Sequence, residues 1–228
     1  MMKILSAIAG WIENGQTPGK ANARRLRGLV LLLRYSGLRI GDAVSCSVDR
    51  LANGKLRLYT QKTGTHVHCP LPEFVVKELE AIPKMSEHYW FWTGNGKLQT
   101  AVGDWQGRLL DLFKDMKVKQ FARVHKITEQ EARKQLRAKG GKFAEGHAHR
   151  FRDTFAVELL LAGVPLERVS ILLGHTSVKI TEKHYAPWVR ERQEQAEADV
   201  RRTWAHDPIA LLETKGTPEV HEKRGPLN

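Results

Sequence analysis

The chain has 228 residues, 41% of them apolar, which is enough for one large domain or two small ones with a substantial core. Its 37 Lys and Arg outnumber its 25 Asp and Glu, and the net charge of +12 favours a polyanionic partner, nucleic acid first. Two cysteines, Cys46 and Cys69, are too few for a disulfide framework and indicate a reducing cytoplasm. No apolar run approaches the roughly 20 residues of a membrane span, so we expect no membrane partner.

The first predicted elements are helices. Apolar residues recur at helical spacing over 3–13 and again over 20–35, which predicts two amphipathic helices separated by a glycine-containing break. Arg24 and Arg25 lie on the basic face of the second helix and are candidates for DNA contact, although such a face is usually only solvated. A Ser-Gly step ends that helix, and a short helix over 38–46 follows.

A β-hairpin is predicted next. Residues 55–60 alternate apolar and polar side chains as a half-buried strand does, and 67–71 can return beside them. The connecting residues 61–65 contain a glycine and form the turn, so Lys62 is expected at the tip of the hairpin. We expect this hairpin to belong to a small sheet of two or three strands.

The middle of the chain returns to helix. Proline is well tolerated at a helix start, so Pro72 opens a helix that runs to about residue 82. The aromatic run at 89–92 predicts a buried strand or extended segment, and a further helix is expected over 100–116.

Residues 117–152 form a basic block, with 11 Lys or Arg against 3 Glu. Inside it, Thr128 and the glutamate three residues later form a capping box for a helix to about residue 138, and a Gly-Gly joint follows. We suspect that this block contacts DNA, with Lys142 and Arg150 as candidates. A solvated surface insertion would have the same composition.

Three short helices and one long helix are predicted after the basic block. The first spans 154–162 and the second opens at a proline and ends near residue 173. Ser177 can cap the third, which carries Lys179, a further DNA-contact candidate, and Tyr185. A proline at 187 is expected to interrupt the chain before a charged helix over 188–204, and residues 205–228 are expected to form a flexible tail.

Polar residues near these helices could converge on one phosphate. His-x-x-Arg occurs in two registers, His147 to Arg150 and His149 to Arg152, and spacing alone does not choose between them. Leu-Gly-His at 173–175 and a tyrosine at 185 follow. Arginine forks suit phosphate oxygens, histidine can donate to them or move a proton, and tyrosine can attack the phosphorus and form a covalent intermediate.

Together these signals resemble the catalytic domain of the tyrosine recombinases, the phage integrase family. The resemblance rests on the segment RFRDTFAVELLLAGVPLERVSILLGHTSVKITEKHY. In it, Thr-Phe-Ala follows Arg152 after one intervening residue, as in the family pattern. This match selects His149 and Arg152 over the other register and aligns His175 and Tyr185 with the family pattern. Position 153 holds Asp where many relatives carry His, and we expect little effect from this departure.

The resemblance extends upstream, so that it covers about residues 20–190. Ser-Gly-Leu-Arg-Ile ending at Ile40 resembles the motif of the family's first arginine, here Arg39, and Asp42 stands at the acidic position that follows it. Lys62, ahead of a Thr-Gly step, matches the lysine of the family's hairpin.

The resemblance implies a role for each matched residue. Tyr185 would attack the scissile phosphorus and leave DNA joined as a 3′-phosphotyrosine with a free 5′-hydroxyl. Arg39 and Arg152 would bind the non-bridging oxygens, and His175 would donate a further hydrogen bond. His149 would support the phosphate and assist proton removal. Lys62 would protonate the leaving 5′-oxygen, with Asp42 in a supporting role.

The resemblance also implies the architecture and partners. We expect a mainly α fold with a small antiparallel β-sheet over residues 1–204, without the N-terminal core-binding domain that family integrases usually carry. The partner would be double-stranded DNA, on which four protomers assemble, whereas a monomer is expected alone; the chain would lie in the cytoplasm and on the nucleoid when bound. Because the reaction conserves bond energy, neither ATP nor a metal cofactor is implied.

Other readings use the same residues differently. A type IB topoisomerase shares the chemistry, and a non-catalytic helix-turn-helix protein could use the helices at 154–162 and 165–173 to bind DNA. His147-Ala148-His149 superficially matches the metal site of relaxases, and His66, His68 and Cys69 could suggest zinc. The relaxase reading needs a broad antiparallel sheet, and the zinc reading lacks a fourth ligand at fixed spacing.

Overall fold

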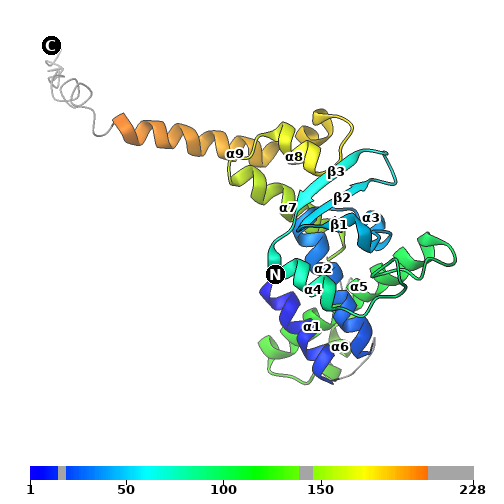
Figure 1. Ribbon diagram of the computed structural model, residues 1–228. Coiled ribbons are helices and arrows are strands. Elements are labelled where there is room, and N and C mark those ends of the chain that lie inside the picture. Colours follow the sequence, from blue (N-terminus) through cyan, green and yellow to red (C-terminus); the bar gives the residue numbers. More distant parts are fainter. Residues whose placement is uncertain (15–18, 139–145, 205–228) are drawn as a thin grey trace, which may run out of the picture.

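The computed structural model describes residues 1–14, 19–138 and 146–204, and within them a body of helices packs beside one small antiparallel sheet at the edge of the molecule (Figure 1). The helices are α1 (Met2–Asn14), α2 (Lys20–Ser36), α3 (Ile40–Val44), α4 (Glu73–Ala81), α5 (Leu98–His125), α6 (Glu129–Ala138), α7 (His149–Leu161), α8 (Leu166–Leu172) and α9 (Val178–Trp204). The strands are β1 (Leu51–Ala52), β2 (Lys55–Tyr59) and β3 (His66–Pro70). The predicted fold class is therefore confirmed. None of the described helices is both long and apolar enough to cross a membrane.

The core is built around α2. Its apolar residues from Leu29 to Leu33 are all buried, because α1 packs on one side and α7 on another. α4 crosses α2 near Gly28, where an added Cβ atom would lie 2.8 Å from Ile82 Cδ1 and would push the end of that side chain aside. Arg34 of α2 pairs with Glu158 of α7 at the edge of the contact. These contacts hold the C-terminal end of α2 against α7, where the site residues lie.

The sheet has the order β1-β2-β3, and both pairings are antiparallel. Leu56 pairs with Cys69 in the register of β2 and β3, and both side chains are buried. His66 and His68 lie on the opposite, exposed face of β3. The strand alternation therefore separates the cysteine from the two histidines, which removes the basis for a zinc site on this strand.

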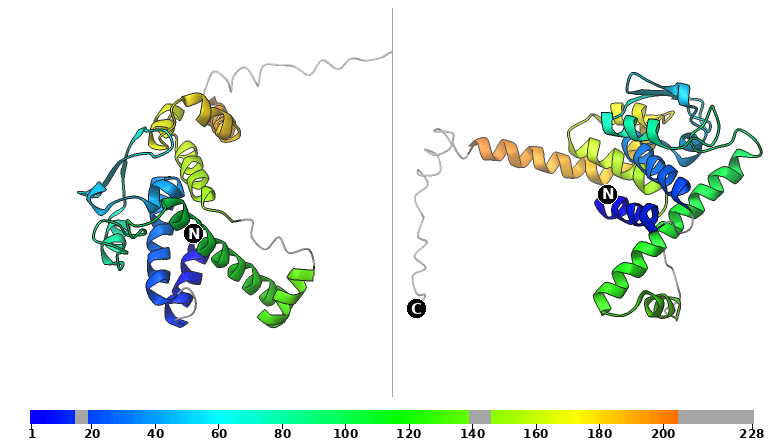
Figure 2. Two further views of the ribbon diagram at one scale, coloured as in Figure 1. Left: turned by 90° about the vertical axis from the view of Figure 1, so that its right-hand side faces the viewer. Right: turned by 60° about the horizontal axis from the view of Figure 1, so that its bottom comes forward.

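The predicted end of α5 is wrong. This helix continues to His125 instead of ending near residue 116, because Val118 and Ala122 prolong its apolar stripe and pack against Ala132 of α6. The first part of the basic block therefore belongs to α5, and α6 folds back against its end (Figure 2). The predicted cap is present, since the backbone N–H of Glu131 donates to Thr128 Oγ1 at 3.2 Å.

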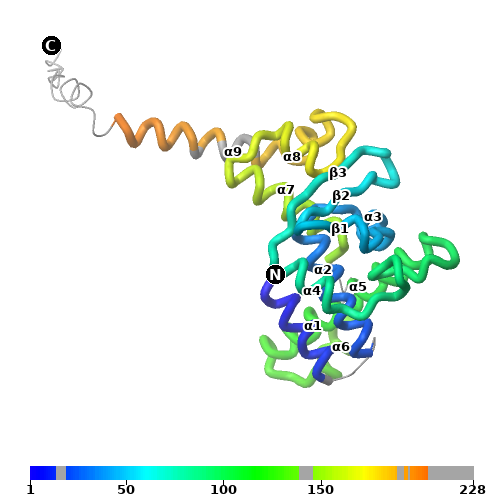
Figure 3. The backbone as a smooth tube through the Cα atoms, in the orientation of Figure 1, coloured from blue at the N-terminus to red at the C-terminus, as the bar shows by residue number. Residues whose placement is uncertain are grey.

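Pro187 does not interrupt the chain. α9 runs through it from Val178 to Trp204 and projects away from the body of the molecule (Figure 3). Tyr185 is buried just before the proline and its ring lies 6.0 Å from that of Trp188, so packing on both sides of Pro187 offsets the lost backbone hydrogen bond. The predicted glycine joint at 140–141, Lys142 and the predicted tail at 205–228 lie outside the described residues.

Candidate active site

Arg152 is the buried centre of the candidate site. It lies in the first turn of α7, is 2% exposed, and its guanidinium reaches two other segments of the chain. Nη1 donates to the carbonyl oxygen of Gly37 at 2.7 Å, and Nη2 donates to that of Leu173 at 2.6 Å. Arg150, in the competing register, is exposed. Of the two candidate arginines, Arg152 and not Arg150 therefore lies in the interior.

The turn at Gly37, which accepts a hydrogen bond from Arg152, is followed two residues later by Arg39. Gly37 ends α2 with φ +63°, a conformation that glycine adopts without strain, and a Cβ there would clash with the ring of Phe155. Arg39 follows in extended backbone and precedes α3, which is why that helix starts at Ile40 and not at residue 38. Arg39 Nη1 is buried, and within the described part of the chain no group hydrogen-bonds to it. A buried, unpaired guanidinium nitrogen is suited to an anion from outside the chain.

A second glycine turn positions His175. Gly174 has φ +62° after α8, and Arg152 Nη2 lies 2.9 Å from His175 Nε2. Because a guanidinium only donates, Nε2 must accept this hydrogen bond and the ring proton lies on Nδ1. Nδ1 can then donate to Thr181 Oγ1, 2.7 Å away on α9. In this state the Nε2 that would face a phosphate is an acceptor, so donation to DNA requires a second proton or the other tautomer.

Gly174→Ala is expected to destabilise the chain by about 1–3 kcal/mol, because it strains the backbone and crowds the hairpin. A Cβ at this position would lie 2.8 Å from Val67 Cγ2 and 2.9 Å from Thr60 Cγ2. Denaturant unfolding measures the change. Gly107→Ala in the interior of α5 is the matched control, since nothing lies within 4 Å of its added Cβ. The control should be neutral or slightly stabilising, and equal losses in both variants would contradict the argument.

The lowered pKa of His175 makes the free energy of unfolding depend on pH. Burial and then the charge of Arg152 lower its pKa to about 4. Between pH 6.5 and 4, His175 therefore binds a proton in the unfolded chain but stays neutral in the folded chain. The free energy of unfolding falls as the pH drops through this window. The loss should be roughly 1 kcal/mol, allowing for solvent screening at a partly exposed ring. Urea unfolding at pH 7 and pH 4.5 measures it.

His175→Gln should reduce this pH dependence, because the amide cannot take up a proton, and the part that remains includes His149, whose pKa burial also lowers. His68→Gln, an exposed histidine on β3, serves as the control and should leave the slope nearly unchanged. Equal slopes for His175→Gln and the original chain would show that another group sets the acid limit.

Tyr185 docks in its own chain. Its side chain is 3% exposed, packs in a small core with Ala156, Leu160 and Val169, and its hydroxyl donates to Asp153 Oδ1 at 3.0 Å. Burial first, then the charge and the hydrogen bond of Asp153, raise the pKa of Tyr185 above its ordinary value. The positive charges of Arg152 and Arg39 oppose this rise, which places both arginines within electrostatic reach of the hydroxyl.

The two arginines and His149 act on one another as neighbours. Burial and the charge of Arg39 lower the pKa of Arg152 to about 10. Burial also lowers the pKa of His149, against the opposing effect of Asp153. His149 is more exposed than Arg152, and its Nε2 lies 3.7 Å from Asp153 Oδ1. The predicted residues Arg39, Arg152, His149, His175 and Tyr185 therefore share one electrostatic environment.

Asp42 fixes the hairpin that carries Lys62. Its Oδ1 accepts a hydrogen bond from the backbone N–H of Gln61 at 2.8 Å, one residue before the lysine. On the other side of the lysine, Thr63 Oγ1 donates to the carbonyl oxygen of Gly174 at 3.3 Å. Lys62 is exposed between these two anchors. The structure thus gives Asp42 a positioning role and attaches the lysine's turn to the turn before His175.

The predicted DNA-contact residues differ in their surroundings. Arg24, Arg150 and Lys179 are exposed. Arg25 instead uses its guanidinium within the chain, where Nε donates to the carbonyl oxygen of Pro83 at 2.6 Å and Nη2 to that of Lys84 at 3.1 Å. Arg25 therefore joins α2 to the segment after α4, and its position on a basic face did not reveal this.

Two residues without a predicted role contact the site. Thr181, fully buried on α9, is the partner of His175 Nδ1, and Asp153 is the partner of the Tyr185 hydroxyl. Only the departure from the family pattern at position 153 could have drawn attention to Asp153. Thr181 carried no signal, because a threonine one turn before a tyrosine is common on helices.

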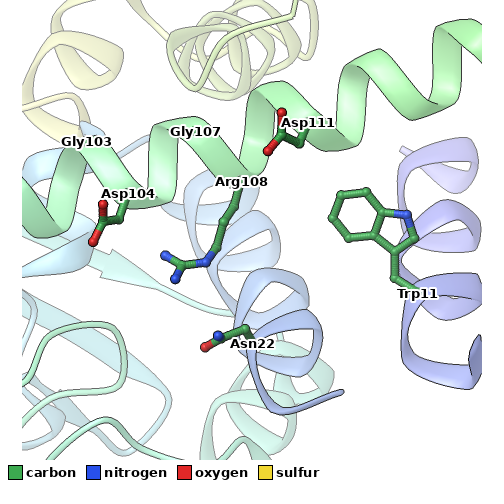
Figure 4. A pocket seen from close by; sticks show the side chains of 7 residues that line it. All are labelled: Trp11, Asn22, Gly103, Asp104, Gly107, Arg108 and Asp111. Atoms are coloured by element: carbon green, nitrogen blue, oxygen red, sulfur yellow. The ribbon is translucent and has the colours of Figure 1, made fainter. Parts of the chain in front are cut away.

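A separate cleft of about 440 Å³ lies between α1, α2 and α5, but none of the site residues lines it (Figure 4). Its walls carry Asp104, Arg108 and Asp111, which are charges of both signs. Within the ranges that the structure describes, no three His, Cys, Asp or Glu side chains gather as metal ligands do. His147-Ala148-His149 therefore finds no third ligand there, and the sheet of three strands differs from the broad sheet that the relaxase reading needs.

Arg152, His175 and Tyr185 thus lie close together on a helical scaffold, and Arg39 offers a buried guanidinium nitrogen without a hydrogen-bond partner among the described residues. The chain belongs to the phage integrase family, whose model matches residues 5–191. The resemblance drawn from the motifs is therefore confirmed. No curated protein sequence matches the chain.

Two crystal structures share the fold at low sequence identity. XerH site-specific recombinase, bound to palindromic difH substrate in a post-cleavage complex, is 17% identical with a TM-score of 0.53, over 86% of this chain and 50% of that one. XerA recombinase is 17% identical with a TM-score of 0.50, over 85% of this chain and 61% of that one. The chain thus spans about half to three-fifths of the length of these proteins.

Proposed function

We propose that this chain is the catalytic domain of a site-specific tyrosine recombinase that cleaves and rejoins DNA. The observation that carries the proposal is the docking of Tyr185 in the same chain, where its hydroxyl bonds to Asp153, the residue next to the buried Arg152. A tyrosine alone is a weak nucleophile at neutral pH, and cations that hold the phosphate stabilise the charge that develops during attack. Membership of the phage integrase family supports the same chemistry.

Each site residue has a part in the proposed reaction. Tyr185 Oη attacks the scissile phosphorus and forms a 3′-phosphotyrosine, while the 5′-oxygen leaves with a proton from Lys62. Arg39 Nη1, which has no partner among the described residues, binds a non-bridging oxygen. Arg152 and His175 stabilise the same phosphate, and His149 supports it from the start of α7. Attack by the 5′-hydroxyl of a partner strand reverses the steps, so the energy of the phosphodiester is conserved without ATP or a metal.

The proposed partner is double-stranded DNA. Exposed Arg24, Arg150 and Lys179, together with the basic block, would contact its phosphates. Residues 1–204 would form the catalytic domain, monomeric alone and tetrameric on two synapsed duplexes, in the cytoplasm and on the nucleoid. The projecting part of α9 offers a surface for a neighbouring protomer, with Val200 and Trp204 exposed on it.

The test is covalent trapping on a nicked suicide duplex in the presence of EDTA. The target sequence is unknown, so a pool of candidate sites is used. The expected result is a protein–DNA band on a denaturing gel, with the DNA linked to the tryptic peptide that contains Tyr185. A band only with added divalent metal, or a link to Tyr59 or another residue, would refute the proposal. Shifted DNA without a covalent band would favour the helix-turn-helix reading.

A further inference from the structure

The hydroxyl of Tyr185 is hydrogen-bonded to a carboxylate to which the family pattern assigns no role. Asp153 follows Arg152 directly in α7, and its Oδ1 accepts a hydrogen bond from Tyr185 Oη at a distance of 3.0 Å. Tyr185 is buried, whereas the Asp153 side chain is 41% exposed at the edge of the site. The carboxylate therefore lies between the nucleophile and solvent, at hydrogen-bonding distance from the proton that must leave.

The surroundings of the hydroxyl decide when that proton can leave. Burial, the charge of Asp153 and its hydrogen bond raise the pKa of Tyr185, and Arg152 and Arg39 only partly oppose them. A free phenolate is therefore scarce at neutral pH, even beside two arginines. The proton has to depart while the oxygen–phosphorus bond forms, and this requires an acceptor in contact with the hydroxyl.

We propose that Asp153 is the general base of the cleavage reaction; the assignment rests on the function proposed above. As the Tyr185 oxygen bonds to phosphorus, its O–H bond breaks and the proton moves to Asp153 Oδ1, which becomes a carboxylic acid. The bond from phosphorus to the 5′-oxygen breaks, and that oxygen takes its proton from Lys62. In the rejoining step Asp153 returns the proton to the tyrosine.

His149 occupies a different place. Its Nε2 lies 3.7 Å from the same Asp153 oxygen, whereas the hydroxyl of Tyr185 bonds to Asp153 itself. His149 thus borders the acceptor and does not replace it. Among the described residues, the charges that act on the hydroxyl are those of Asp153 and Arg152 from α7 and of Arg39 before α3. His149 borders Asp153, and the ring of His184 lies 6.4 Å from that of Tyr185. Only Asp153 in this set carries negative charge.

The test separates the base from the acid by changing the leaving group. Cleavage rates are measured on an ordinary suicide duplex and on one with sulfur in place of the bridging 5′-oxygen, which leaves readily without a proton. Asp153→Asn is expected to be about 100-fold slower on both substrates, because the base acts on the nucleophile. Lys62→Ala should be slow on the ordinary substrate and recover on the sulfur substrate.

A matched control and a pH profile distinguish catalysis from packing. Glu182→Gln removes one negative charge from an exposed position three residues from Tyr185, and its rates should stay within about twofold of the original chain. In Asp153→Asn, the cleavage rate should rise up to about tenfold per pH unit between pH 7 and 9. Without the base, Tyr185 must lose its proton to solvent before it attacks the phosphorus. The original chain should depend much less on pH in this range.

Three outcomes would overturn the assignment. Cleavage by Asp153→Asn as fast as, or faster than, the original chain would mean that the contact merely restrains Tyr185. A slow variant whose pH profile stays parallel and whose melting temperature falls would give Asp153 a structural role. Recovery of the variant on the sulfur substrate would place Asp153 on the leaving-group side. If the original chain forms no adduct with either substrate, the proposed function fails and the base assignment fails with it.

Discussion

Tyr185→Phe is expected to abolish covalent attachment to DNA while leaving the fold intact. Phenylalanine keeps the ring that packs with Ala156, Leu160 and Val169, but it removes the oxygen that would attack the phosphorus. Asp153 loses one hydrogen bond, and its partly exposed carboxylate can turn to water instead. We expect the cleavage rate to fall by at least about 10⁴-fold, with a stability change within about 1 kcal/mol.

Gel analysis of the suicide duplex and urea unfolding of the same preparation check the two parts of this prediction. Tyr59→Phe on β2 is the control, because its side chain is 67% exposed, and it should retain both activity and stability. A residual adduct in Tyr185→Phe that maps to another residue would show that the nucleophile is assigned wrongly. Loss of the fold in the variant would show that the hydrogen bond between Tyr185 and Asp153 stabilises the domain by far more than about 1 kcal/mol.

Arg152→Lys is expected to reduce both cleavage and stability, although it keeps the positive charge. The guanidinium reaches the carbonyl oxygens of Gly37 and Leu173 and the ring of His175 at the same time, and an ammonium cannot match this planar fork. Two buried carbonyl groups would lose their donors, which should cost about 2–4 kcal/mol. Cleavage should fall by about 10²–10³-fold, as when a transition-state donor is removed.

Arg150→Lys makes the identical change two residues earlier on the same helix, at an exposed position. Its stability should stay within about 0.5 kcal/mol of the original chain, and its cleavage should change far less than that of Arg152→Lys. Urea unfolding and single-turnover cleavage measure both variants. Similar losses at both positions would mean that the guanidinium of Arg152 has no special role.

The framework of the site follows from local sequence. Glycines that follow helical patterns predicted the turns at Gly37 and Gly174, and hydrophobic periodicity predicted the helices around them. The alternation in β2 and β3 predicted the hairpin and placed Lys62 near its tip. These features depend on residues close together in the chain, and the backbone preferences of glycine and the spacing of apolar residues decide them. Family membership and the fold class could therefore be predicted.

Contacts between distant side chains could not be predicted in the same way. Whether Asp153 turns toward Tyr185, 32 residues away, depends on how α7 and α9 pack and on which rotamers that packing permits. The same holds for Thr181 beside His175 and for Arg25, whose partners lie 58 and 59 residues further along the chain. The helix through Pro187 also depends on tertiary packing, which outweighs the local preference of proline.

Under the proposed function DNA would have a second role, as a ligand that completes the fold, because Nη1 of Arg39 has no hydrogen-bond partner within the described residues. A buried donor without a partner costs free energy in the chain by itself, and a phosphate oxygen at that position would remove the cost. Mass action would then raise the free energy of unfolding as the concentration of free duplex increases, by about 2.7 kcal/mol when that concentration is a hundredfold above Kd. The domain should therefore be most resistant to heat and to proteases on its target, and free copies should be degraded first.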